Sequence, residues 1–147
     1  MSRPSPPRGD RHRPPRVGRL TGVLEFLSAE WFARFAAELA RVEPVPGAPP
    51  LALGQVVKGA PQGDVAWTVL VDDERAELVL GSTDRATVTL VEDWATARAI
   101  ACGSPVSELL AAGRITLRGD ANALLAGQAQ FEVLSAALGA LEATTRA

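Results

Sequence analysis

The chain carries few side chains suited to nucleophilic or acid–base catalysis, and their positions do not bring them together. His12 is the only histidine. It lies in an N-terminal segment that we expect to be disordered, so a Ser–His–acid or Cys–His arrangement would have no base within the fold. Cys102 is the only cysteine. Its position near a predicted helix end favours a small core or half-buried residue over a reactive thiol. The sequence therefore predicts no catalytic residues.

The carboxylates are better explained as turn and cap residues than as a metal or acid–base site. Asp72, Asp73 and Glu74 are consecutive but lack the ligand spacing and the glycine of a calcium loop, which favours a solvated hairpin turn. Glu92 and Asp93 are adjacent, so they are not a facing acid–base pair, and Asp93 is placed to cap a helix. No Cys/His set for zinc is present, and the glycines match neither the phosphate loop nor the dinucleotide motif. We therefore expect a non-enzymatic protein with no metal and no cofactor.

Length and composition favour one domain preceded by a basic tail. The 147 residues suit a single domain with a sizeable core. Residues 1–20 hold six arginines, one aspartate and five prolines, which predicts a disordered segment of net charge +5. Such a tail could bind anionic lipid or nucleic acid, but an extension with no function is the preferred interpretation. Residues 21–147 form the predicted domain.

The charge of that domain argues against nucleic acid as a partner. The remaining residues carry nine bases and sixteen acids, a net of −7, so no broad basic face is expected. No apolar run is long enough to span a membrane, and no signal sequence follows the N-terminal arginines. With a single cysteine, these features predict a cytoplasmic protein with at most transient contact with a membrane surface.

Alternating apolar positions and turn residues predict an α/β (α+β) fold. We expect a five-stranded, mainly antiparallel sheet covered by helices on one side. The predicted strands are 52–58, 65–71, 76–80, 86–91 and 114–118.

Four helices are predicted from caps and apolar stripes. The first starts at Ser28 and presents apolar residues every four positions. Two short helices follow Asp93 and Ser104, each ended by a glycine. The last is capped by Asp120, and its stripe of Leu124, Phe131 and Leu138 is interpreted as core rather than as a coiled-coil surface.

The order of these motifs resembles the sterol carrier protein type-2 (SCP2) domain family. The resemblance rests on Ala-Thr-Val-Thr-Leu at 86–90, on Trp94 and Ile100 ahead of Gly103, and on Gly-Arg-Ile-Thr-Leu-Arg-Gly-Asp at 113–120. It implies a small α/β lipid-binding module with a five-stranded sheet and an apolar tunnel. It also implies non-catalytic binding or transfer of a sterol, a fatty acid or another apolar lipid.

Two functional interpretations of the apolar residues remain open from sequence. In the first, an apolar small molecule occupies a tunnel between sheet and helices. The residues predicted to line it are Trp67, Val69, Leu78, Trp94, Leu109, Ile115, Leu117, Phe131 and Leu134. In the second, the core is filled and the chain is an interaction or accessory module, for example a homodimer formed through the C-terminal helix.

Overall fold

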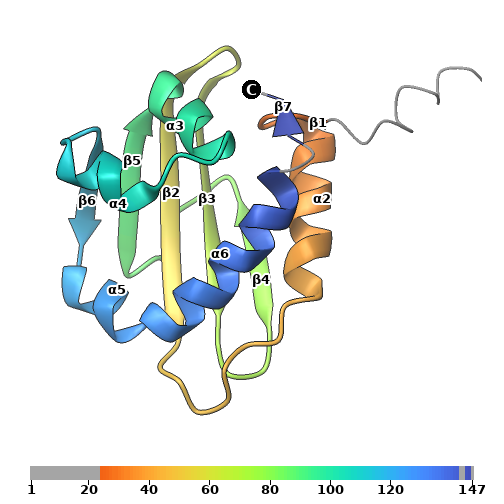
Figure 1. The fold of residues 1–147 in the computed structure, drawn as a ribbon, viewed down its shortest axis with the longest axis vertical. Coiled ribbons are helices and arrows are strands. Elements are labelled where there is room, and N and C mark those ends of the chain that lie inside the picture. The colour runs from red at the N-terminus through yellow and green to blue at the C-terminus, as the bar shows by residue number, and fades with distance from the viewer. Residues whose placement is uncertain (1–23, 143–144, 147) are drawn as a thin grey trace, which may run out of the picture.

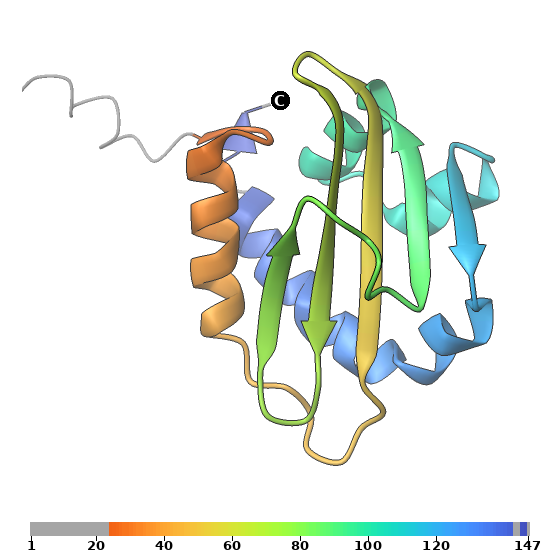
Figure 2. The same ribbon diagram turned by 180° about the vertical axis from the view of Figure 1, so that it is seen from behind.

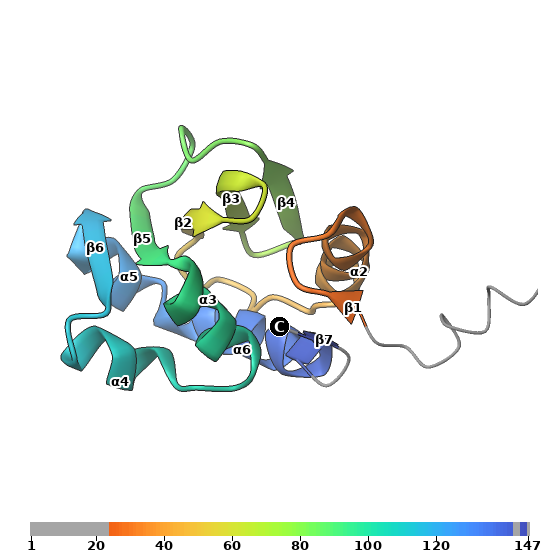
Figure 3. The same ribbon diagram turned by 90° about the horizontal axis from the view of Figure 1, so that it is seen from above.

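The computed structural model describes residues 24–142 and 145–146 of the chain. The predicted tail at 1–20, including His12, lies outside the described residues, so the proposed division of the chain stays a prediction. Within the described part, a five-stranded sheet carries all its helices on one face (Figures 1 and 2). Figure 3 shows the resulting two layers from above, with the sheet over the helices.

The sheet has the strand order β4-β3-β2-β5-β6. Its strands are β2 (Leu51–Ala60), β3 (Gly63–Val71), β4 (Ala76–Leu80), β5 (Val88–Asp93) and β6 (Ile115–Gly119). In this sheet β2 and β5 pair in parallel, whereas the other three pairs are antiparallel. The predicted α+β fold with a mainly antiparallel sheet and one-sided helices is therefore confirmed. The strand bounds differ from the prediction by up to two residues, and β5 begins at residue 88 rather than 86.

The register assigns one face of the sheet to the helices. Gln55 on the central strand β2 pairs with Trp67 of β3 and with Leu90 of β5, so these three side chains share a face. Leu53, two residues before Gln55 on β2, belongs to the same face and is buried. Because alternate positions on a strand point to the same side, Glu92 of β5 also lies on this face, two residues beyond Leu90.

The first long helix, α2 (Ala29–Ala40), begins where its sequence predicts. Ser28 caps it, because its hydroxyl accepts a hydrogen bond from the Trp31 backbone N–H at 3.1 Å. Trp31, Phe35 and Leu39 recur every four residues and are all buried. Their common face fixes α2 against the sheet and against the C-terminal helix.

The remaining helices depart from the prediction at two places. Helices α3 (Trp94–Ala101) and α4 (Val106–Ala111) are present, but Pro105 rather than Ser104 is the N-cap residue of α4. The last predicted helix is two helices, α5 (Ala121–Ala126) and α6 (Gln128–Glu142), which are separated at Gly127. Gly127 is packed against Leu51, since a Cβ there would lie 3.0 Å from Leu51 Cδ1. This close approach to the sheet coincides with the break.

A short second sheet joins the two ends of the described chain. β1 (Leu24–Glu25) pairs in parallel with β7 (Thr145–Arg146). The indole of Trp31 reinforces this junction, because Nε1 donates to Thr145 Oγ1 at 3.0 Å. Two-residue strands have no usable periodicity, so the sequence offers no signal for this pairing.

Gly119 closes the Gly-Arg-Ile-Thr-Leu-Arg-Gly-Asp motif for a steric reason. Its φ is +91°, and a Cβ at this position would lie 2.6 Å from the Thr87 backbone oxygen. Gly113 at the other end of the motif has a φ of +77° but open space around it. The two glycines therefore share a left-handed backbone, but only Gly119 also permits close contact between backbones.

We expect Gly119→Ala to lower the free energy of unfolding by roughly 1–3 kcal/mol, since the new methyl group adds a clash to the backbone strain. Gly113→Ala is the matched control and should cost about 1 kcal/mol, from strain alone. Urea denaturation of both variants measures the difference. Equal losses at the two positions would contradict the steric role of Gly119.

Candidate functional site

A cavity of about 350 Å³ lies between the helix-covered face of the sheet and the helices. It is enclosed by α2 and the segment that leads into it, by the three central strands, by α3 with its following loop and the start of α4, and by α6 with β7. Its volume is in the range of small-molecule sites, about 300–1,000 Å³. The lining residues are Phe26, Trp31, Phe35, Leu53, Gln55, Trp67, Leu90, Glu92, Ala97, Ile100, Ala101, Gly103, Ser104, Pro105, Val106, Ser107, Phe131, Ser135, Leu138, Leu141, Glu142 and Thr145.

Packed aromatic rings form one wall of this cavity. Trp31 is at the centre, with its ring centroid 5.0 Å from Phe26, 5.3 Å from Phe35 and 6.1 Å from Trp67. Phe26 also stacks on Trp94 at 5.5 Å. Edge-to-face and stacked pairs at these distances are favourable, so the wall is held in shape by its own contacts.

The cavity wall also contains a buried carboxyl group. Glu92 is 3% exposed, and its Oε2 accepts a hydrogen bond from Gln55 Nε2 at 2.9 Å. The pKa of Glu92 is raised from 4.5 to about 7, mainly because the carboxyl is buried. The Gln55 hydrogen bond opposes this rise, and the negative charge of Asp93 adds to it. The carboxyl is thus close to half-ionised at neutral pH.

Two polar atoms of cavity-lining residues lack a hydrogen-bond partner among the described residues. They are Glu92 Oε1 and Trp67 Nε1, and both are buried. An unpaired buried polar group costs about 1–3 kcal/mol, and more if it is charged. Native proteins seldom leave such groups without a role, a ligand or a bound water.

Only some of the nine residues predicted to line the tunnel lie at the cavity. Trp67 and Phe131 line the cavity, whereas the other seven are outside its lining. Three of those seven are buried in the core: Val69, Ile115 and Leu134. The remaining four are half-buried and packed against the core: Leu78, Trp94, Leu109 and Leu117. Contact of any of the nine with lipid stays a prediction.

Several lining residues were not singled out as site residues from the sequence. Trp31 and Phe35 were recognised only as a helix stripe, which has the same pattern whether it faces a packed core or a cavity. Glu92 was set aside because it adjoins Asp93. The alternation Val88, Leu90, Glu92 on β5 was the available signal, since it places the carboxyl on the buried face.

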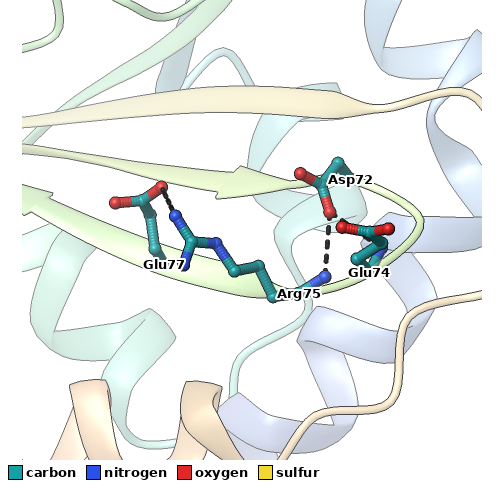
Figure 4. Close-up of polar contacts among 4 residues, drawn as sticks. All are labelled: Asp72, Glu74, Arg75 and Glu77. Atoms are coloured by element: carbon teal, nitrogen blue, oxygen red, sulfur yellow. Dashed lines mark hydrogen bonds and ion pairs between the residues drawn. The ribbon is translucent and has the colours of Figure 1, made fainter.

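The acidic cluster at 72–74 is a turn, as the sequence indicates. Asp72 Oδ1 accepts hydrogen bonds at 2.8 Å from the backbone N–H groups of Glu74 and Arg75 (Figure 4). Arg75 also lies 3.5 Å from a carboxylate oxygen of Glu77. These bonds close the loop between β3 and β4. Within residues 24–142 and 145–146, no group of three or more His, Cys, Asp or Glu residues could hold a metal ion.

Cys102 is exposed at the C-terminal cap of α3, whereas the sequence favoured a core or half-buried position.

Comparison with solved structures identifies the architecture. A conserved hypothetical protein of Thermus thermophilus, described as a candidate sterol carrier protein, superposes with a TM-score of 0.55 at 21% identity. The match covers 78% of this chain and 88% of that chain. The chain has the SCP2 fold. The predicted resemblance to that family is therefore confirmed at the level of the fold.

Two mosquito proteins share the SCP2 fold with this chain. Palmitated sterol carrier protein 2-like 2 of Aedes aegypti matches with a TM-score of 0.52 and 24% identity, over 73% of this chain and 95% of that one. Sterol carrier protein 2-like 3 of the same species matches with a TM-score of 0.50 and 12% identity, over 70% and 94%. No protein-family model matches the sequence, and no curated protein is significantly similar to it. In the SCP2 fold described here, no helix is long and apolar enough to cross a membrane.

Proposed function

We propose that this chain binds one molecule of an apolar lipid in the cavity between sheet and helices, without catalysing a reaction. The observation that carries the proposal is the 350 Å³ cavity with its aromatic wall. Each methylene transferred from water into such a site contributes about 0.8 kcal/mol, so a chain of ten gives roughly 8 kcal/mol before binding costs. The SCP2 fold supports the proposal, because relatives with this fold are named sterol carrier proteins.

The arrangement of the wall favours binding over chemistry. Its polar side chains include Gln55, Glu92 and Ser135, and the described lining contains no histidine or cysteine. Non-directional desolvation by Phe26, Trp31 and neighbouring apolar groups would supply the affinity, and the shape of the cavity would set the limit on ligand size. Transfer between membranes would extend the same binding activity.

The alternative of an interaction module has weaker support. It required the Leu124, Phe131 and Leu138 stripe to be left in solvent, but all three side chains pack against the core. Phe131 and Leu138 also line the cavity. A homodimer through α6 stays a prediction without a supporting contact.

Native mass spectrometry of the purified chain, followed by lipid extraction, tests the proposal. We expect a single stoichiometric mass increment that organic solvent removes and that returns after incubation with a lipid. A chain that keeps its bare mass after incubation with long-chain alcohols, fatty acids and sterols would overturn the proposal and leave the interaction module.

A further inference from the structure

The polar groups of the cavity form a line across three neighbouring strands. Gln55 on β2 lies between Trp67 on β3 and the Leu90–Glu92 segment of β5, because the register pairs it with Trp67 on one side and Leu90 on the other. Gln55, Trp67 and Glu92 all line the cavity. One end of the line presents an indole N–H and the other a carboxyl.

Two polar atoms of this line have no hydrogen-bond partner among the described residues. The Gln55 amide is bonded to Glu92 Oε2 at 2.9 Å, which orients the carboxyl. Glu92 Oε1 is left as a free acceptor and Trp67 Nε1 as a free donor. Glu92 is 3% exposed and lines the cavity, so a ligand in the cavity is a candidate partner for this buried acceptor.

The charges around the carboxyl argue against an anionic head group. No lysine or arginine is among the described residues that line the cavity. The charged or titratable groups that accompany Glu92 are its neighbour Asp93 and, on the wall contributed by α6, Glu142. A ligand carboxylate would therefore meet like charge in a poorly solvated site and find no counterion.

We propose that the cavity selects an uncharged lipid with a hydroxyl group, and that Glu92 Oε1 accepts the hydrogen bond from that hydroxyl. This inference rests on the proposed lipid-binding function and names the ligand class within it. A hydroxyl donates one hydrogen bond and also offers lone pairs, which the free indole N–H of Trp67 could use. The apolar remainder of the ligand would occupy the aromatic side of the cavity.

The test compares head groups on one alkyl chain, using the delipidated full-length protein at about pH 8, where Glu92 is mostly ionised. The probes are 1-dodecanol, its methyl ether, dodecanoate and dodecylamine, titrated by calorimetry. We expect dodecanol to bind roughly tenfold to a hundredfold more tightly than the ether, which cannot donate a hydrogen bond. Dodecanoate should bind more weakly than dodecanol.

Two substitutions separate the acceptor from its charge. Glu92→Met removes the acceptor, so the difference between alcohol and ether should fall to within about twofold. Glu92→Gln removes the charge and keeps one acceptor oxygen, which stays available to the ligand when the new NH2 group donates to the Gln55 amide oxygen. The preference for alcohol over ether should then remain, and the discrimination against dodecanoate should shrink. Glu108→Gln, an exposed position on α4, is the control and should behave like the wild-type protein.

The outcomes distinguish this inference from the function on which it rests. Equal binding of alcohol and ether by the wild-type chain, or an unchanged difference in Glu92→Met, would overturn the inference and leave lipid binding intact. Tighter binding of dodecylamine than of dodecanol would also overturn it, in favour of a cation site. Failure of all four probes to bind would overturn both proposals.

Discussion

Substitution of Ala101 by phenylalanine is expected to abolish lipid binding while the chain stays folded. Ala101 is the last residue of α3, is 8% exposed and lines the cavity. A phenyl group there would occupy volume that the lipid needs. Because several methylenes of the lipid would then stay in water, the Kd should rise by about a hundredfold or more. Calorimetric titration of the delipidated variant measures the loss.

A matched control separates occlusion from damage to the helix. Ala95→Phe adds the same side chain to the same helix at an exposed position and should bind lipid like the wild-type protein. Thermal unfolding of Ala101→Phe should show a cooperative transition, since the new ring fills space instead of displacing a packed neighbour. If the folded Ala101→Phe variant retained wild-type affinity, the ligand would have to bind elsewhere.

The stability of the protein should fall as the pH rises from about 4.5 to about 7, because of Glu92. The pKa of this carboxyl is raised from 4.5 to about 7 by burial, so the folded chain holds a proton that the unfolded chain releases throughout that window. The stability that protonated Glu92 contributes is fully present below pH 4.5 and is lost as the pH rises through the folded-state pKa of about 7. By linkage the total loss is on the order of 3 kcal/mol.

Urea denaturation across the pH range measures this effect directly. Glu92→Gln should show a nearly flat profile in the same window, because the amide does not titrate, and should be more stable than the wild-type chain above neutral pH. The pKa values of Asp64, Asp72 and Asp93 are lowered by hydrogen bonds to backbone N–H groups, so the stability they contribute is lost only in more acidic solution. Parallel profiles for the wild type and Glu92→Gln would contradict the assigned environment of Glu92.

These two experiments address different parts of the same cavity. Ala101→Phe tests whether the space is used, and the pH profile tests whether Glu92 is as buried as the structure places it. A lipid bound next to Glu92 would change the second result as well, so delipidated and loaded samples should give different pH profiles if the ligand hydrogen-bonds to the carboxyl.

Local sequence patterns predicted the elements of this fold. The every-fourth-residue stripe of Trp31, Phe35 and Leu39 with the Ser28 cap defined α2, and the alternation at 65–71 defined most of β3. Asp93 was correctly placed as the cap of α3, since its side chain accepts from the Thr96 N–H at 2.8 Å. Such signals are visible because they depend on residues within one or two turns of each other.

The cavity could not be predicted at the same level, because it depends on how distant elements pack. The sequence determined which side chains are apolar and which face of each element they share. Trp67 lines the cavity, whereas Val69, two residues along the same strand, is buried in the core. This difference was decided by where α2, α3 and α6 lie over the sheet. Only that arrangement also placed Glu92 on the wall of the cavity, since adjacency to Asp93 carries no information about three-dimensional surroundings. A packed core and a lipid cavity require the same residue types, and a few side-chain volumes separate them.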